Sequence, residues 1–335
     1  MHALVLEEIN KPLRFVQRPD VTVGPGQVSV AVKAAALNRR DFWITQGMYP
    51  GVKMPVVLGS DGAGIVTEVG EGVEAQWRDR SVVINPGLAW GTNRSVQSSA
   101  FRILGMPDDG TFATQVVVPA DVVHQKPEHL SWQQAAALPL GGVTAYRALF
   151  TQGQLTRGDR VLVTGVGGGV ATVTVQMAVA AGAIVYVTSS SDDKLDQARE
   201  LGATAGFNYT RKEWPAELKA EAGAVDLVVD SAGGEGYEAT VNLAAPGGRI
   251  VSYGATAGPA KKLDLFKVFW KQLRLVGTTM GSPEDFQEMI EFVGRHQIAP
   301  TIDQVVPLAD GAAAVERMRE SPQFGKMVLD CQDVA

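Results

Sequence analysis

A glycine-rich turn between an apolar strand and a helix is the clearest chemical signal in the chain. The strand Val161–Val163 leads into a segment in which glycine recurs at short intervals before a helical pattern begins. Only glycine lets the backbone come close to a phosphate, and a helix N-terminus offers unpaired N–H groups and the positive end of its dipole. This order predicts that the pyrophosphate of a dinucleotide cofactor binds Gly165, Gly167, Gly168, Gly169 and Val170.

The residues at the end of the next strand predict which dinucleotide is used. A site for NADH places a carboxylate there to bind the ribose 2′-hydroxyl, whereas this chain has Thr188–Ser191 and then Lys194. We expect Ser189, Ser190 and Lys194 to bind the 2′-phosphate of NADPH through hydroxyl groups and one positive charge. The alternative is that these serines only cap the next helix, and two aspartates follow close by. Ser191 can cap the helix while the other two bind.

Composition excludes several classes of protein. The chain has 335 residues, with 30 Lys and Arg against 36 Asp and Glu and a net charge of −6. This balance gives no electrostatic footprint for nucleic acid or for an anionic membrane surface, so the expected partner is a small molecule. Its one cysteine, Cys331, excludes intrachain disulfides and cysteine-rich zinc sites. A reducing cytoplasm fits best, and the N-terminus lacks the pattern of a secretory signal.

Two regions of different periodicity must position these residues. Residues 1–128 show short alternating strands broken by Gly and Pro, which predicts an irregular β domain. Residues 129–281 alternate strands with helices, which predicts an α/β fold with a parallel sheet covered on both faces. Its strands are expected at Arg160–Thr164, Ile184–Thr188, Phe207–Tyr209, Val225–Val229 and Arg249–Ser252.

Helix boundaries are also readable. A helix is expected over Asp192–Leu201, with Ser191 as its N-cap. Residues 282–335 form a third segment, in which Ser282 as N-cap and Pro283 at the first position open another helix. A last strand around Lys326–Leu329 is expected to return to the first domain.

Motifs along nearly the whole chain carry a family resemblance. In chain order they are Ala36–Asp41, Leu58–Val66 with Val69–Gly70, Gly110–Ala113, Ala135–Pro139 with Thr144–Tyr146, the glycine turn, Asp230–Gly234, Pro246–Arg249 and Phe324–Lys326. Together they resemble the medium-chain dehydrogenase/reductase superfamily, and within it the quinone oxidoreductase-like branch that works without zinc. The resemblance implies a GroES-like β domain formed by residues 1–128 and 282–335, and a Rossmann nucleotide-binding domain formed by residues 129–281.

The zinc-dependent members of this superfamily differ from the chain at their metal positions. They carry cysteine where Asn38 stands, histidine where Ser60 stands, and a third ligand near Leu138 and Pro139. They also carry four closely spaced cysteines in a lobe that corresponds to residues 85–105, which has none here. These residue types are not zinc ligands, so no metal site is predicted.

The resemblance suggests four candidate catalytic residues. Asn38 is the first, because its amide can both donate and accept hydrogen bonds, although an asparagine that merely ends a strand is the alternative. Asp41 orients neighbouring groups or transfers a proton, or is instead solvated or starts a helix. Tyr49 lines the pocket or donates a proton, or packs through its ring. Thr144 lies beside the nicotinamide or starts a helix.

Further cofactor contacts follow from the same resemblance. Arg39 is expected at the pyrophosphate, Tyr209 near the 2′-phosphate and Lys326 on the phosphate side. Contacts to the nicotinamide half are expected from Tyr253, Gly254, Ala255, Thr279 and Met280.

These residues predict hydride transfer from NADPH without metal assistance. Without a Lewis acid, hydrogen-bond donors alone must stabilise the oxyanion that forms when the hydride arrives. A conjugated acceptor spreads this charge, so we expect reduction of quinones, α,β-unsaturated carbonyls or reactive carbonyls. The alternatives are an enoyl-thioester reductase and a non-catalytic NADPH-binding sensor or structural protein. Family members pair through the nucleotide domain, which implies a homodimer or homotetramer with Leu273–Val276 at the pairing edge.

Overall fold

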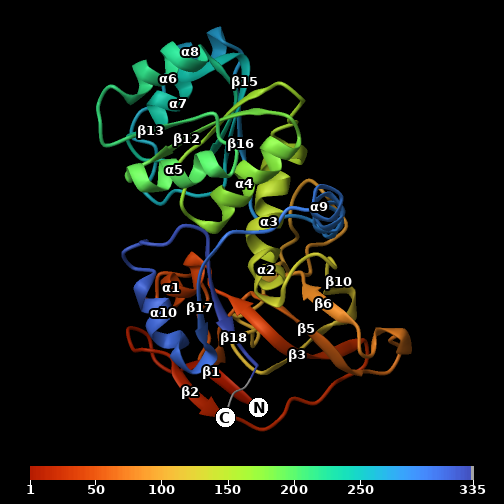
Figure 1. The fold of residues 1–335 in the computed structure, drawn as a ribbon. Coiled ribbons are helices and arrows are strands. Elements are labelled where there is room, and N and C mark those ends of the chain that lie inside the picture. Colours follow the sequence, from red (N-terminus) through yellow and green to blue (C-terminus); the bar gives the residue numbers. More distant parts are fainter. Residues whose placement is uncertain (333–335) are drawn as a thin grey trace. The chain divides into compact units, whose positions relative to one another are not determined.

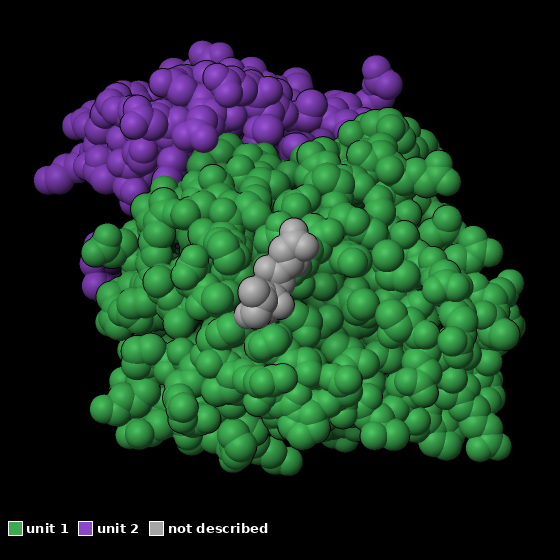
Figure 2. Space-filling model, turned by 60° about the horizontal axis from the view of Figure 1, so that its bottom comes forward, with its two compact units in different colours: residues 1–140, 282–335 green, residues 141–281 purple. Residues whose placement is uncertain are grey.

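The computed structural model describes residues 1–332, which fold into two compact units (Figure 1). Unit 1 combines Met1–Leu140 with the segment from Ser282 onward, and unit 2 is Gly141–Gly281. Figure 2 colours the two units separately. No helix within residues 1–332 has both the length and the apolar character needed to cross a membrane.

Unit 1 is a β domain. Its strands are β1 (His2–Leu6), β2 (Arg14–Gln17), β3 (Gln27–Ala36), β4 (Val56–Val57), β5 (Asp61–Val69), β6 (Ser81–Ile84), β7 (Gly87–Leu88), β8 (Arg102–Ile103), β9 (Gln115–Pro119), β10 (Val123–Gln125), β17 (Ile302–Pro307) and β18 (Lys326–Asp330). The largest sheet has the order β10-β6-β5-β3-β18-β17, and β9 also pairs with β3. In this sheet β18 runs antiparallel to β3, with Val328 opposite Ala36, so the C-terminal segment shares a sheet with the N-terminal residues.

Unit 1 also contains four α-helices and three 3₁₀ turns within the described residues. They are α1 (Arg39–Thr45), α2 (Trp132–Ala137), α9 (Pro283–His296) and α10 (Gly311–Arg317), with the 3₁₀ turns η1 (Ala75–Trp77), η2 (Ala120–Val122) and η4 (Leu308–Asp310). The start predicted for α9 is confirmed. The Ser282 hydroxyl accepts a hydrogen bond from the backbone N–H of Asp285, and the Asp285 carboxylate accepts one from the N–H of Ser282.

Unit 2 is an α/β domain with a parallel sheet. Its strands are β11 (Arg160–Val163), β12 (Ile184–Ser189), β13 (Ala205–Asn208), β14 (Val225–Asp230), β15 (Ala244–Ser252) and β16 (Arg274–Gly277). They lie in the order β13-β12-β11-β14-β15-β16, and every neighbouring pair is parallel. This is the strand order of a Rossmann sheet, with the reversal between β11 and β14. The predicted fold class is therefore confirmed.

Helices precede the first strand of this sheet and connect its strands (Figure 1). They are α3 (Pro139–Tyr146), which begins at the end of unit 1, the π-helical turn η3 (Arg147–Gln152), α4 (Gly169–Ala180), α5 (Asp192–Glu200), α6 (Trp214–Ala222), α7 (Tyr237–Leu243) and α8 (Leu265–Trp270). The prediction for α5 is confirmed, because the Ser191 hydroxyl accepts a hydrogen bond from the N–H of Lys194.

The division between the units differs from the sequence expectation at one point. Unit 1 continues to Leu140, whereas the change of periodicity suggested a division after residue 128. The reason is tertiary: α2 packs against β3, β5 and β18, and its Ala135, Ala136 and Ala137 are buried there. A helical pattern alone does not reveal which sheet a helix covers.

Candidate functional site

The glycine turn of unit 2 lies where the order of the sheet reverses. Gly165 and Gly167 have φ angles of 66° and 143°, which side chains rarely adopt. Gly168 is the N-cap of α4, and no side chain caps this helix. A Cβ on Gly168 would meet no atom within 4 Å. The turn therefore leaves an open approach to the helix N-terminus, and this cradle fits a pyrophosphate.

Lys194 reaches this turn from α5. A Cβ on Gly167 would lie 3.0 Å from Lys194 Cδ and 3.3 Å from Lys194 Nζ. Ser189 is buried at the end of β12, while Ser190 beside it is exposed. The N–H of Tyr209 donates to the Ser189 carbonyl at 3.0 Å, so the ends of β12 and β13 lie together. The side of unit 2 that carries the glycine turn therefore also carries Lys194, Ser189, Ser190 and the half-exposed Tyr209.

Arg211 is a residue that sequence reasoning missed. Its guanidinium donates to the Asp192 carboxylate at 2.8 Å, and the amide of Asn208 donates to the same carboxylate at 3.0 Å. The charge of Asp192, which disfavours a phosphate nearby, is therefore paired. The signal in the sequence was a basic residue three positions after β13.

The other predicted cofactor residues of unit 2 follow the strands next in the sheet. Tyr253, Gly254 and Ala255 come after β15, and Thr279 and Met280 come after β16. Parallel strands end at one edge, so these residues share the edge that carries the glycine turn. Burial raises the pKa of Tyr253 to about 12, which keeps its phenol protonated at neutral pH.

Asp230 ties the ends of three strands together at this edge. Its carboxylate accepts a hydrogen bond from the Thr164 hydroxyl at 2.6 Å and from the N–H of Gly233 at 3.0 Å. Its backbone carbonyl accepts from the N–H of Tyr253 at 2.9 Å. The ends of β11, β14 and β15 are thereby held in one arrangement.

In unit 1, Asn38 belongs to a buried cluster with Asp61 and Lys326. The amide Nδ2 of Asn38 donates to Asp61 Oδ2 at 2.9 Å. The ammonium of Lys326 donates to Asn38 Oδ1 at 2.7 Å and to Asp61 Oδ2 at 2.8 Å. The side chains of Asp61 and Lys326 are 0% and 4% exposed, so this is a fully buried ion pair. We call these three residues the Asn38 cluster.

Adjacent strands position the Asn38 cluster. Asn38 follows the end of β3, Asp61 opens β5 opposite Ala36, and Lys326 opens β18 on the other side of β3. Gly325 directs the chain into β18 with a φ of 101°, where a Cβ would lie 2.3 Å from a backbone oxygen. The sequence resemblance assigns Lys326 and Asn38 to different roles and gives no role to Asp61, because their meeting depends on the pairing of three strands.

Arg40 and Ser60 form a second polar contact nearby. Arg40 donates to the Ser60 hydroxyl at 2.6 Å and to the Leu104 carbonyl at 3.0 Å. Ser60 in turn donates to the same carbonyl at 2.8 Å. The hydrogen-bonding capacity of Ser60 is thus used within the protein. The Arg40 guanidinium also lies over the ring of Tyr49, with 5.0 Å between them.

Asp41 is completely buried in the first turn of α1. Its Oδ2 accepts a hydrogen bond from the backbone N–H of Asn38 at 2.7 Å, so it satisfies the helix start. Its Oδ1 has no hydrogen-bond partner within the described residues. Burial raises the pKa of Asp41 to about 6, although Arg40 and Lys326 oppose this shift.

Arg39 and Thr144 are the remaining candidates. The half-buried guanidinium of Arg39 donates to the Met318 carbonyl and the Ser321 hydroxyl, which are neutral partners. Within residues 1–332 it forms no ion pair, which suits a contact with an anion. Thr144 is buried on α3 in unit 2. The roles suggested for these residues stay predictions.

The donor set at the positions expected for zinc does not fit a metal ion. The Ser60 hydroxyl is bonded to a guanidinium, and both ends of the Asn38 amide are engaged by Asp61 and Lys326. A divalent cation here would face two buried positive charges and no thiolate or imidazole. In the part of the chain that the structure describes, no three His, Cys, Asp or Glu residues gather in a metal-binding group.

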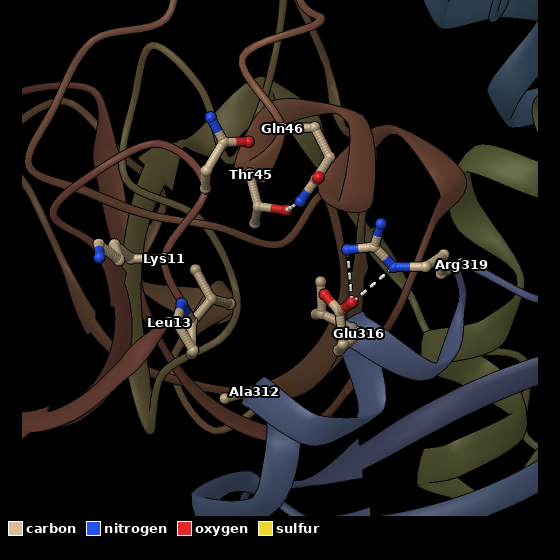
Figure 3. Close-up of a pocket in the computed structure, with 10 residues that line it drawn as sticks. Lys11, Leu13, Thr45, Gln46, Ala312, Glu316 and Arg319 are labelled. Carbon is tan, nitrogen blue, oxygen red and sulfur yellow. Dashed lines mark hydrogen bonds and ion pairs between the residues drawn. The ribbon is translucent and has the colours of Figure 1, made fainter.

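A cavity of about 380 Å³ opens elsewhere in unit 1 (Figure 3). Residues of the 10–13 loop, the end of α1 and α10 line it, and Arg319 points at Glu316 to form an ion pair. None of the predicted site residues lines this cavity. The charged side chains that line this cavity do not point toward a common centre, so the cavity does not resemble a catalytic site.

Two family models match separate parts of the chain. Residues 24–128 match the model of the alcohol dehydrogenase GroES-like domain, and residues 169–295 match that of the zinc-binding dehydrogenase family. A zinc-type alcohol dehydrogenase-like protein of Leptosphaeria maculans is 38% identical over 95% of this chain and 94% of that protein.

Solved structures extend the similarity. The crystal structure of an NAD-dependent alcohol dehydrogenase is 37% identical with a TM-score of 0.93, covering 98% of this chain and 99% of that one. A crotonyl-CoA carboxylase/reductase in complex with NADP is 25% identical with a TM-score of 0.89, covering 98% and 94%. The chain therefore belongs to the medium-chain dehydrogenase/reductase superfamily, as an oxidoreductase of the zinc-type alcohol dehydrogenase-like group.

Proposed function

We propose that this oxidoreductase uses NADPH to reduce quinones, α,β-unsaturated carbonyls or reactive carbonyls, without a catalytic zinc. The observation that carries the proposal is the Asn38 cluster. Asn38 stands at one of the positions where zinc-dependent members of the superfamily hold the metal, and its amide is hydrogen-bonded to the buried Asp61 and Lys326. When bound, the reduced nicotinamide would supply a hydride.

The chain's own groups must then stabilise the charge that develops on the acceptor oxygen. A simple ketone concentrates this charge on one oxygen, so its reduction is harder without a Lewis acid. A quinone or an enone delocalises it, so hydrogen-bond donors are sufficient. The preference for activated acceptors follows from this difference.

Residues of unit 2 support NADPH over NADH. Lys194 reaches the glycine turn. Ser189 ends β12 and Ser190 follows it, at the place where an NADH site carries a carboxylate. The guanidinium of Arg211 pairs with the Asp192 carboxylate and weakens the repulsion that this carboxylate exerts on a nearby phosphate. Among the similar solved structures, one protein is NAD-dependent and another is in complex with NADP. The preference of this chain for NADPH or NADH therefore has to be argued from its own residues.

A panel of acceptors tests the proposal. Consumption of NADPH is measured with a benzoquinone, methyl vinyl ketone, methylglyoxal and acetone, and repeated with NADH. We expect turnover with the first three acceptors, little with acetone, and a preference for NADPH. Efficient reduction of acetone, or one stoichiometric zinc by elemental analysis of the purified protein, would contradict the proposal.

An enoyl-thioester reductase is the second candidate. The similarity to a crotonyl-CoA carboxylase/reductase in complex with NADP favours it. Crotonyl-CoA is therefore added to the panel, and a kcat/KM for it far above those of the other acceptors would select this activity. Tight NADPH binding without turnover of any acceptor would instead indicate a non-catalytic sensor or structural protein.

A further inference from the structure

The amide of Asn208 fixes the carboxylate of Asp192 where two strands of unit 2 end. Its Nδ2 donates to the Ser190 carbonyl at 3.3 Å and to Asp192 Oδ1 at 3.0 Å. Its Oδ1 accepts from the N–H of Thr210 at 3.0 Å and from the Thr210 hydroxyl at 2.7 Å. Asn208 is buried, so both ends of its amide are engaged within the protein. Asp192 is therefore held beside Ser190, directly after the end of β12.

Arg211 binds this carboxylate with only part of its guanidinium. One N–H group of Nη2 donates to Asp192 Oδ2 at 2.8 Å. Among residues 1–332, the remaining N–H groups of the guanidinium have no hydrogen-bond partner, and the side chain is 58% exposed. An exposed ion pair of this kind contributes little to stability, because water solvates both charges well. The guanidinium thus keeps donors for a further anion at the end of β12.

The charges around the expected 2′-phosphate call for a second cation. A phosphate monoester carries a charge of about −1.5 to −2 at pH 7. Asp192 and Asp193 lie in the first turn of α5, and Lys194 follows them. Without Arg211, one lysine would be opposed by two carboxylates and the phosphate. With Arg211, each carboxylate has one positive charge to balance it, and a planar fork of N–H groups is added that matches phosphate oxygens.

We propose that Arg211 binds the 2′-phosphate of NADPH as a second cation beside Lys194, held at the end of β12 by the Asp192 carboxylate. This inference rests on the proposed use of NADPH. It concerns only the adenosine end of the cofactor, whose expected contacts lie within unit 2. Lys194 supplies a point charge next to the glycine turn. Arg211 supplies paired N–H groups and counteracts the repulsion from Asp192.

Binding of 2′,5′-ADP, measured by isothermal titration calorimetry, tests Arg211 without an acceptor or a nicotinamide. This probe carries the 2′-phosphate, and 5′-AMP is the same fragment without it. For Arg211→Ala we expect the Kd for 2′,5′-ADP to rise about tenfold or more and that for 5′-AMP to change less than about twofold. Arg211→Lys should recover part of the affinity, because it keeps the charge and loses the fork.

A double-mutant cycle distinguishes direct contact with the phosphate from screening of Asp192. Asp192→Asn removes the negative charge and keeps an oxygen that can accept from Asn208. In this background Arg211→Ala should still raise the Kd for 2′,5′-ADP about fivefold or more, although no carboxylate remains to be screened at this position. A loss that disappears in the Asp192→Asn background would show that Arg211 only screens Asp192, which would overturn the proposal.

Arg199 provides the matched control. It lies in the last turn of α5, is 47% exposed and pairs with the exposed Asp196. Arg199→Ala removes the same charge at the far end of the helix, so the Kd for both probes should stay within about twofold of wild type. Both variants should keep the wild-type melting temperature within about 2 °C, since each loses only an exposed ion pair. Equal losses of affinity in Arg199→Ala and Arg211→Ala would contradict the proposal, because only the net charge of unit 2 would then matter.

Failure of this inference is distinguishable from failure of the proposed function. A preference for 2′,5′-ADP over 5′-AMP that persists unchanged in Arg211→Ala would refute the role of Arg211 and leave the use of NADPH intact. A wild-type protein without this preference would refute both. An Arg211-dependent preference in a protein that reduces no acceptor would support the role of Arg211 and refute the reductase function alone.

Discussion

Asp41 shows how a single buried carboxyl group can make stability depend on pH. Burial raises the pKa of Asp41 from 3.8 to about 6. Between these values, the folded protein keeps a proton that the unfolded chain has released. The contribution of protonated Asp41 to stability is therefore complete below about pH 4 and is lost as the pH rises through 6.

Asp41→Asn tests this linkage. The amide stays neutral at every pH, so the difference in free energy of unfolding between variant and wild type should shift in favour of the variant from pH 4 to pH 7. A shift on the order of 3 kcal/mol corresponds to the raised pKa. Urea unfolding at several pH values measures it. A difference that stays constant across this range would mean that Asp41 ionises normally.

At the scale of elements, a substitution at the junction of β11 and α4 is expected to weaken cofactor binding without a large change in stability. Gly168 has an ordinary φ of −81°, and a Cβ there would enter open space. We predict that Gly168→Ala changes the free energy of unfolding by less than about 1 kcal/mol. The same methyl group would occupy the approach to the helix N-terminus, so the Kd for NADPH should rise about tenfold or more.

Unchanged affinity of Gly168→Ala for NADPH would indicate that the phosphates lie elsewhere. Gly167→Ala is the informative comparison, because a φ of 143° is strained for any side chain and a Cβ there would lie 3.0 Å from Lys194 Cδ. It should weaken both stability and binding. Differential scanning calorimetry measures the loss of stability, and the fluorescence of bound NADPH measures the loss of affinity.

The junction of β12 and α5 decides between NADPH and NADH. Lys194→Ala should weaken NADPH binding about tenfold or more, since a charge-assisted bond to the 2′-phosphate is lost, and should leave NADH binding unchanged. Lys219→Ala, an exposed lysine on α6, is the control for general electrostatics. Equal losses for the two cofactors would contradict the assignment of Lys194.

At the scale of the whole molecule, an exposed apolar surface on α8 indicates association with another protein chain. It consists of Leu265, Phe266, Phe269 and Trp270 on α8, with Trp270 73% exposed. The Phe266 and Trp270 rings stack on each other in solution-facing positions. Close in sequence, β16 ends the order of the unit 2 sheet and includes the exposed Leu275. Edge strands and aromatic patches of this kind favour association.

We predict a homodimer or a larger homo-oligomer formed through this part of unit 2. Size-exclusion chromatography with light scattering gives the mass. Phe266→Ser combined with Trp270→Ser should shift it toward the monomer, whereas Met48→Ser, at an exposed methionine of unit 1, should not. A wild-type protein that stays monomeric at all concentrations would contradict this prediction.

The parts of the fold that local patterns govern were predictable from the sequence. The alternation of strands and helices indicated the Rossmann sheet, and Ser191 and Ser282 marked the starts of α5 and α9. Each depends on hydrogen bonds or periodicity within a few residues. The glycine turn belongs to the same class, since the positive φ angles at Gly165 and Gly167 require glycine.

Tertiary structure decided the arrangement of the site in unit 1. Lys326 lies 288 positions from Asn38, and only the pairing of β18 with β3 and of β3 with β5 brings both to Asp61. The assignment of α2 to unit 1 likewise depends on the surface that it covers. Local sequence patterns were enough to locate the strands of unit 2, the glycine turn and the residue types at the zinc positions. Only packing decided which buried charges meet, because such contacts depend on strand pairing across the whole chain.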